Sequence, residues 1–279
     1  MTNQLFINNE FIESQSKETM DVINPATGEA FDTITLATEE EVNDAIEKSQ
    51  QAQLEWERVP QPTRAEHVKL LIPLLEKNRD EIAQLYVKEQ GKTLTQAYGE
   101  IDKSISFIDY MTSLSMSDKG RILQNSIANE TIQIINKPIG VTAGIVPWNA
   151  PILVLMRKVI PAIVTGCSVV IKPSEETTLL TLRLAELFRA STIPAGLIQI
   201  VPGTGETVGT QLASHKDIQL ISLTGSMRAG KSVYENAAQT VKKVNLELGG
   251  NAPVIVTSNA DLDKAVDYIV TAPVSYTHL

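Results

Sequence analysis

From Val141 onward, short runs of apolar residues alternate with stretches of helical periodicity. Short apolar runs bounded by turn residues are typical of buried strands, whereas apolar residues spaced three and four apart are typical of helices. Regular alternation of the two predicts a parallel sheet with helices on both faces. The predicted strands are 141–146, 169–171, 197–201, 218–223 and 241–246, and the predicted helices are 152–164, 178–190, 206–212 and 229–238.

The first 118 residues have a different pattern, in which a short β segment precedes several helices. Residues 5–12 predict a hairpin, and residues 24–29 predict a turn. We expect Pro73 to break one of the helices and Gly91 to end another. Residues 121–137 alternate in places and lack a helix cap, which predicts extended structure. Two helices are predicted to begin at capping boxes, namely Thr38 with Glu41 and Thr63 with Glu66.

The composition is that of a globular protein with an acidic balance. The 279 residues suffice for one large domain or two ordinary ones. The chain has 24 Lys and Arg against 33 Asp and Glu, and the net charge of −9 argues against nucleic acid or an anionic membrane as a partner. Residues 145–164 are the most apolar region, but prolines and charges interrupt them, and residues 1–11 lack a secretory pattern. We therefore expect a cytoplasmic protein without a membrane span.

Cysteine and histidine are scarce. The single cysteine, Cys167, excludes an internal disulfide and a cysteine-based metal cluster, and the three histidines lack ligand spacing. Cys167 precedes a predicted buried strand and has no neighbouring base in sequence. We interpret it as a structural thiol and predict no metal site.

Two glycine-containing turns each follow a predicted strand and open a predicted helix. The first has Gly203, Gly205 and Gly209, one residue longer than the common dinucleotide fingerprint. The second is Thr224-Gly225-Ser226. Backbone N–H groups at such helix starts bind phosphate, but a tight turn without a ligand explains the glycines equally well.

Three polar positions follow other strand ends. Lys172 and Glu175 could bind the two ribose hydroxyls of an adenosine, although a solvated ion pair is the simpler explanation. The amide of Asn149 could stabilise an oxyanion, or it could only cap the helix from Pro151. Glu247 ends an apolar run before two glycines, where backbone can approach a ligand closely.

These segments together resemble the aldehyde dehydrogenase superfamily, over about residues 5 to 272. Within it, the chain is most similar to the NAD-linked lactaldehyde and glycolaldehyde dehydrogenases. The motifs that carry the resemblance, in the order and spacing of the family, are Asn24-Pro25-Ala26-Thr27-Gly28, Pro147-Trp148-Asn149, Lys172-Pro173-Ser174-Glu175, Gly203-x-Gly205, Thr224-Gly225-Ser226 and Leu246-Glu247-Leu248-Gly249-Gly250.

The resemblance implies a mechanism in which a cysteine thiolate attacks an aldehyde and hydride passes to the nicotinamide, which leaves a thioester. Asn149 would stabilise the oxyanion, and Glu247 would activate the water that hydrolyses the thioester. A carboxylate at Glu175 implies NAD rather than NADP. The cofactor-binding residues that the resemblance implies are Val146, Trp148, Lys172, Ser174, Glu175, Gly205, Gly209, Thr224, Gly225, Ser226 and Leu248.

The resemblance also implies a division of the chain. Residues 1–118 and 138–247 would form a Rossmann-like NAD-binding domain, and residues 119–137 an arm that joins copies into a homodimer or homotetramer. Residues 248–272 would begin a second α/β catalytic domain. Residues 273–279 resemble a translated sequencing-library adapter, so we expect a non-native tail on an N-terminal fragment that is inactive because it ends before the nucleophile.

Two other functions remain open on the sequence. One is a catalytically inert nucleotide-binding or assembly subunit that lacks a nucleophile. The other is a different Rossmann oxidoreductase that uses no cysteine, which would leave the segment around Glu247 unexplained.

Overall fold

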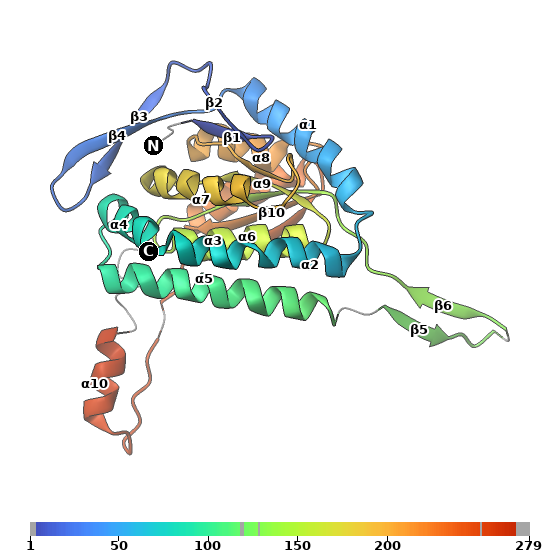
Figure 1. The fold of residues 1–279 in the computed structure, drawn as a ribbon. Helices are drawn as coiled ribbons and strands as arrows, with labels where there is room; N and C mark the ends of the chain where they lie inside the picture. The colour runs from blue at the N-terminus through green and yellow to red at the C-terminus, as the bar shows by residue number, and fades with distance from the viewer. Residues whose placement is uncertain (1–3, 118–119, 128, 252, 272–279) are drawn as a thin grey trace.

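A seven-stranded sheet, in the order β11-β10-β7-β8-β9-β1-β2, forms the centre of the molecule (Figure 1). The computed structural model describes residues 4–117, 120–127, 129–251 and 253–271. The predicted parallel sheet is confirmed, because five neighbouring strands run parallel. These are β7 (Val141–Ile145), β8 (Ser168–Lys172), β9 (Ile198–Ile200), β10 (Leu220–Gly225) and β11 (Lys243–Leu248).

An N-terminal hairpin extends this sheet in the antiparallel sense. β1 (Leu5–Ile7) pairs with β9, and β2 (Glu10–Ile12) pairs with β1. Asn8 and Asn9 form the turn with φ of 54° and 65°, a conformation that asparagine tolerates. The predicted hairpin is confirmed, but its place in the sheet was not foreseen, because this pairing joins residues almost 200 positions apart.

Helices cover both faces of the sheet, and two apolar clusters separate accordingly. On β1, Leu5 and Ile7 belong to one cluster and Phe6 to the other, as the two-residue period of a strand requires. One face packs against α1 (Glu39–Trp56), α8 (Thr210–Ser214) and α9 (Met227–Ala238). The other face packs against α6 (Pro151–Val164) and α7 (Thr178–Ala190). A further layer packs on these two and consists of α2 (Gln61–Lys69), α3 (Leu71–Lys77), α4 (Arg79–Gln90) and α5 (Leu94–Ser115).

The helix boundaries confirm three predictions and correct a fourth. Both hydrogen bonds of the capping box at Thr38 are present, and α4 ends at Gly91, which has a φ of 86°. The helical run breaks at Leu70, and Pro73 lies in the first turn of α3, where its missing N–H is tolerated. The capping box at Thr63 was wrong. The helix α2 already begins at Gln61 with Pro60 as its N-cap, so Thr63 lies inside the helix.

Short irregular helices occur near the strand ends. The helix predicted over 206–212 is a π-helical turn, η2 (Gly205–Gly209), which continues into α8. A 3₁₀ turn, η1 (Glu175–Thr177), precedes α7.

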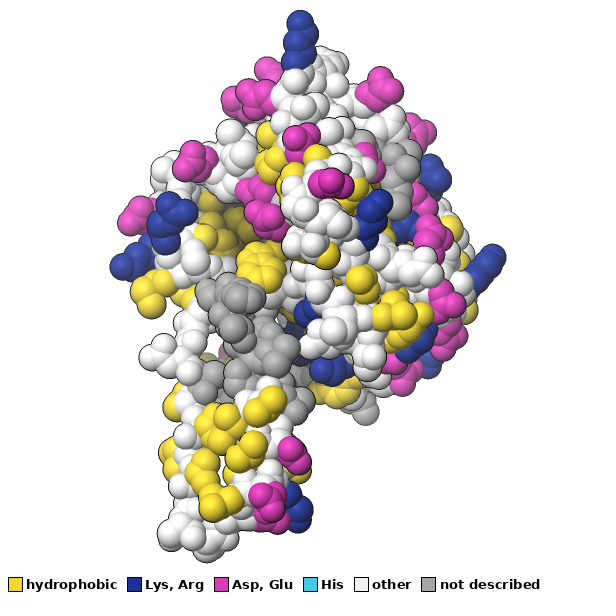
Figure 2. Space-filling model, turned by 90° about the vertical axis from the view of Figure 1, so that its left-hand side faces the viewer, with side chains coloured by type: hydrophobic (Ala, Val, Ile, Leu, Met, Phe, Trp, Pro, Cys, Tyr) yellow, Lys and Arg dark blue, Asp and Glu magenta, His cyan; other side chains and the backbone are white. Residues whose placement is uncertain are grey.

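Two hairpins and a C-terminal helix lie outside the central layers (Figure 1). β3 (Thr19–Asn24) pairs with β4 (Glu29–Thr35) through the predicted turn. β5 (Arg121–Gln124) and β6 (Thr131–Ile134) form an arm that points away from the body. The helix α10 (Leu262–Thr271) projects from another side and carries exposed apolar side chains, as Figure 2 shows. Residues 272–279, and with them the suspected tail, lie outside the described residues.

No helix in the described ranges combines the length and the apolar character that crossing a membrane requires.

Glu89 is a buried carboxylate that holds the start of α7. Its two oxygens accept hydrogen bonds from the backbone N–H groups of Leu179 (2.7 Å) and Leu180 (2.8 Å). Burial raises the pKa of Glu89 to about 8, against these two hydrogen bonds, which favour the charged form. The carboxyl group therefore fixes α4 to α7 while it resists ionisation.

We predict that Glu89 makes the protein less stable as the pH rises. Because its folded-state pKa lies above the unfolded value of 4.5, the folded state binds more protons between these values. Its contribution to the free energy of unfolding is present below about pH 4.5 and is lost as the pH rises to about 8. Urea unfolding of wild type and Glu89→Gln across this range will show wild type losing stability relative to the variant. Parallel pH curves for the two proteins would contradict the prediction.

Val241 carries backbone strain at an exposed position. Its φ is 54°, which β-branched residues rarely adopt, and its side chain is 91% exposed. We predict that Val241→Gly raises the free energy of unfolding by about 1 kcal/mol, because the relief of left-handed strain exceeds the entropy cost of glycine. The matched control is Lys243→Gly, on the exposed strand β11, which should lower stability in the same denaturant titration. Equal destabilisation by both substitutions would show that the backbone of Val241 is not strained.

Candidate functional site

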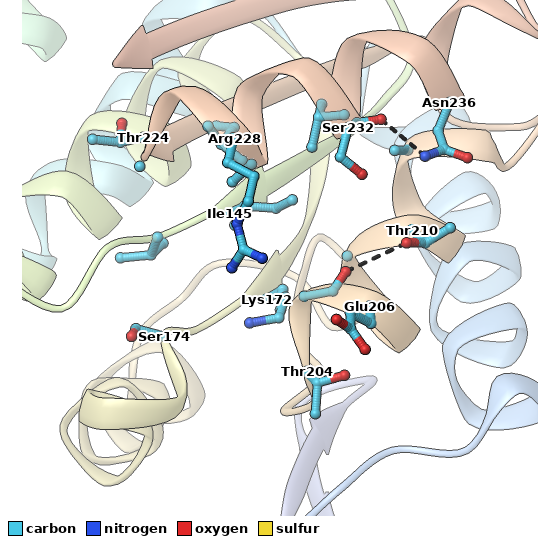
Figure 3. Close-up of a pocket in the computed structure, with 18 of the residues that line it drawn as sticks. Ile145, Lys172, Ser174, Thr204, Glu206, Thr210, Thr224, Arg228, Ser232 and Asn236 are labelled. Atoms are coloured by element: carbon cyan, nitrogen blue, oxygen red, sulfur yellow. Dashed lines mark hydrogen bonds between the residues drawn. The ribbon is translucent and has the colours of Figure 1, made fainter. Parts of the chain in front are cut away.

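A cavity of about 790 Å³ opens beside the carboxyl ends of β7, β8 and β10, between η2 and α9 (Figure 3). Ligands of open α/β sheets bind at these strand ends. The predicted cofactor residues that line the cavity are Val146, Lys172, Ser174, Glu175, Gly205, Gly209, Thr224 and Gly225. The fold therefore places most of the cofactor-binding residues predicted from the sequence around this cavity.

Three glycines leave space along the cavity wall. A Cβ added to Gly205 would meet nothing within 4 Å, and one added to Gly209 or Gly225 would meet no atom closer than 3.6 Å. None of the three has a positive φ, so neither packing nor backbone conformation requires glycine at these positions. In contrast, a Cβ on Gly203 would collide with Val208. The simple-turn explanation therefore holds for Gly203, while the other three glycines leave the wall open to a ligand.

Lys172 and Glu175 form a pair at the end of β8. The Nζ of Lys172 lies 3.1 Å from Oε2 of Glu175 and donates to the carbonyl of Pro173 at 2.9 Å. The Lys172 side chain is only 2% exposed, and this burial lowers its pKa against the opposing effect of Glu175. The alternative of a solvated surface pair is therefore wrong for Lys172.

The start of α9 forms another part of the site. The Oγ of Ser226 accepts a hydrogen bond from the N–H of Ala229 at 3.2 Å, so this hydroxyl is the N-cap of the helix. Leu248 packs beside Gly230, where an added Cβ would lie 2.6 Å from its Cδ2. Neither Ser226, Leu248 nor Trp148 is among the residues that line the cavity. For these three residues the binding role stays a prediction.

Lys158 brings a half-buried cation to the same strand ends, and sequence reasoning missed it. It lies on α6, and its Nζ donates to the hydroxyls of Ser222 (2.9 Å) and Thr224 (3.2 Å). Burial lowers the pKa of Lys158 to about 8, while the charge of Glu247 acts in the opposite direction. Glu247 is the β11 partner of Thr224 in the sheet register, and its side chain is exposed. The predicted base therefore lies near the cavity mouth rather than in its lining.

The peptide of Asn149 is held by one side chain of α4 and one of the loop between α4 and α5. Its carbonyl oxygen accepts hydrogen bonds from Nζ of Lys92 (2.5 Å) and from the hydroxyl of Tyr86 (3.3 Å). Both donors also bind Oε2 of Glu100, at 3.0 Å from Lys92 and 2.6 Å from Tyr86. Burial, followed by the charge of Glu100, raises the pKa of Tyr86 far above its usual value, so the phenol stays a donor.

Glu100 also holds the start of α6. Its Oε1 accepts hydrogen bonds from the backbone N–H groups of Ile152 (3.0 Å) and Leu153 (3.1 Å). The N-cap residue, Ala150, makes no side-chain capping bond. The alternative in which Asn149 merely caps this helix is therefore not what the structure shows. Glu100 performs the capping, and Asn149 keeps its amide for other partners.

Two further site residues were missed by sequence reasoning. Glu100 lies on the inward face of α5 with Ala97 and Ile101, and a carboxylate on a buried helical face was a readable signal. Arg228 lines the cavity from the first turn of α9. Its helix presents Ala229, Ser232, Val233 and Asn236 to the same cavity, and this helical spacing was also readable.

Cys167 lies apart from these groups. It precedes β8, at the opposite end of that strand from Lys172, and is 4% exposed. Its nearest hydrogen-bond partner is the hydroxyl of Thr165, whose oxygen lies 3.7 Å from Sγ. Its burial fits a structural thiol, although the Arg64 guanidinium, which was not foreseen, lies close enough to interact with it electrostatically.

Comparison with known proteins supports one family. A family model described as the aldehyde dehydrogenase family matches residues 11–277. Glutarate-semialdehyde dehydrogenase of Pseudomonas putida is 38% identical over 264 residues, which are 95% of this chain and 55% of that protein. Lactaldehyde dehydrogenase of Escherichia coli is 37% identical over 270 residues, which are 97% of this chain and 56% of that protein. The chain spans about half the length of the curated relatives it matches.

Solved structures have the same fold over nearly the whole chain. A betaine aldehyde dehydrogenase of Staphylococcus aureus in complex with NAD⁺ matches with a TM-score of 0.94 and 34% identity, covering 97% of this chain and 55% of its own. An Escherichia coli NADP-dependent enzyme matches with a TM-score of 0.95 and 36% identity, covering 98% of this chain and 57% of its own.

We predict that Glu100→Ala lowers the free energy of unfolding by about 3 kcal/mol, because it leaves two backbone N–H groups without an acceptor and the partly buried Lys92 ammonium without its carboxylate. Urea unfolding measures this change. The matched control is Glu76→Ala on the exposed side of α3, which should alter stability by less than about 0.5 kcal/mol. If the two variants unfolded at the same urea concentration, Glu100 would not be the anchor of α6.

Proposed function

Because this chain belongs to the aldehyde dehydrogenase family, we propose that it carries the nicotinamide-cofactor site and two catalytic groups of an enzyme that oxidises an aldehyde to a carboxylic acid. The observation that supports this most is the cavity at the strand ends. Gly205, Gly209 and Gly225 leave its wall open, and the buried ammonium of Lys172 lies at its edge.

The cofactor would lie along this wall. The Lys172 ammonium would donate to an adenosine ribose hydroxyl, and the Glu175 carboxylate would accept from one. The N–H groups at the start of α9, beside Thr224 and Gly225, would bind the pyrophosphate. When bound, the cofactor supplies the acceptor for a hydride. The negative charge of Glu175 favours NAD over NADP, because a 2′-phosphate would be repelled there.

The two catalytic groups would act at the nicotinamide end. The Asn149 amide would donate a hydrogen bond to the oxygen on which negative charge develops, and such a donor is worth about 3 kcal/mol. Glu247 would accept a proton from the water that releases the acid. Lys92 and Tyr86 hold the Asn149 carbonyl, so they would position this peptide without touching the substrate.

The family chemistry needs a cysteine nucleophile, and Cys167 is not placed to supply it. This thiol is buried beyond the far end of β8 from the cavity. That these 279 residues alone do not oxidise an aldehyde stays a prediction.

The arm formed by β5 and β6 is the proposed contact with other copies, as a homodimer or homotetramer. Its two strands are exposed throughout. Ile122 (74% exposed), Ile132 and Ile134 (44% each) present apolar surface that association would bury.

We predict that Gly209→Leu abolishes most cofactor binding without unfolding the protein. The new side chain would enter the cavity, where a Cβ has Ile145, Lys172 and the carbonyl oxygen of Thr204 as its nearest neighbours, each at 3.8 Å. NADH affinity, measured by fluorescence of the bound dinucleotide, should fall about tenfold or more. The matched control is Gly99→Leu on α5, where a Cβ also meets nothing within 4 Å and which lies outside the cavity lining. It should leave NADH affinity unchanged.

Wild-type affinity in the Gly209→Leu variant would mean that the cavity is not the cofactor site. A catalytically inert nucleotide-binding subunit would behave like the enzyme in this test. Aldehyde-dependent NADH formation by the complete protein separates the two, and its absence would favour the inert subunit.

A further inference from the structure

Arg228 is a cation of the cavity that the proposed roles leave unused. It lies in the first turn of α9, and Figure 3 shows its guanidinium pointing into the cavity towards Lys172. Within the described part of the chain it makes no ion pair or hydrogen bond. A guanidinium that is aimed into a cavity without a protein partner is available to a ligand.

The position of Arg228 makes an anionic partner favourable. The start of a helix carries partial positive charge, so a cation in the first turn is unfavourable. The first turn of α9 has no acidic residue to offset it. An anion bound between the helix start and the guanidinium removes this conflict.

Glu175 is less able to exclude a phosphate than its charge alone suggests. Its Oε2 pairs with Nζ of Lys172 at 3.1 Å, and its Oε1 accepts from the N–H of Gly205 at 2.8 Å. Both carboxylate oxygens of Glu175 are therefore bound to neighbouring protein groups, and the Lys172–Glu175 pair has no net charge. The other carboxylate of the cavity, Glu206, lies on η2, across the cavity from α9 (Figure 3). Arg228 thus supplies the positive charge on the side of the proposed ribose site.

We propose that Arg228 binds the 2′-phosphate of NADP, so that the site accepts this cofactor as well as NAD. This rests on the proposed function, since it places the adenosine ribose at Lys172 and Glu175. The planar guanidinium can donate two parallel hydrogen bonds to one phosphate, which suits a terminal phosphate group. NAD remains the preferred cofactor because the Glu175 carboxylate lies beside the proposed ribose site. Arg228 reduces the difference in affinity between NAD and NADP.

The test compares dissociation constants of NADH and NADPH for the full chain, by fluorescence or calorimetry. In Arg228→Ala we expect NADPH affinity to fall about tenfold or more and NADH affinity to change less than about threefold. The matched control is Lys231→Ala, which removes one positive charge from an exposed position on the same helix outside the cavity lining. It should change neither affinity. Competition by 2′,5′-ADP should weaken in Arg228→Ala, while competition by 5′-AMP should not.

Three results would overturn the proposal. Equal loss of NADH and NADPH affinity in Arg228→Ala would place the guanidinium at the pyrophosphate, which both cofactors carry. Unchanged affinities would mean that Arg228 faces solvent. Binding of NADH without NADPH by wild type would mean that Glu175 excludes the 2′-phosphate. If wild type bound neither dinucleotide, the proposed function would fail as well, which distinguishes the two failures.

Discussion

Helix α6 is held at both ends by buried side chains of opposite charge, and the candidate site depends on this arrangement. At its start, Glu100 accepts from the N–H groups of Ile152 and Leu153. At its end, Nε of Arg64 donates to the carbonyl of Val164 at 2.9 Å. Both charges match the helix dipole, which favours an anion at the start and a cation at the end. Because Asn149 lies two residues before the first residue of this helix and Lys158 lies within it, fixing α6 fixes two groups at the strand ends.

The charges that fix α6 come from helices distant in the sequence. Burying a carboxylate and a guanidinium costs free energy, which their hydrogen bonds recover only when every donor and acceptor is paired. Here Glu100 is paired with two backbone N–H groups, a phenol and an ammonium. Arg64 donates to Val164 and also to the carbonyl of Val59 at 2.7 Å. A shifted α6 would leave several of these groups unpaired at once, so the arrangement specifies one position of the helix.

The features that followed from the sequence are local ones. Strand and helix alternation from Val141 onward needed only periodicity, and the cavity glycines followed strands in readable turns. The missed features depend on long-range contacts or competing caps. The pairing of β1 with β9 leaves only a weak local signal, and the position of Glu100 on a buried helical face does not reveal that its partner is the start of α6. At Thr63 the local signal was misleading, because the helix begins at Gln61 with Pro60 as its N-cap, three residues before the expected N-cap.

The electrostatics of the strand ends explain why an anionic ligand suits the cavity. Lys172 is buried there and Lys158 is half-buried, and burial lowers the pKa of each because a charged ammonium lacks enough solvation. Glu175 offsets this for Lys172, and Glu247 offsets it for Lys158. The start of α9 and Arg228 add positive charge that no carboxylate of the first turn balances. A ligand that brings phosphates to this edge would favour the charged form of both lysines, so its binding and their protonation reinforce each other.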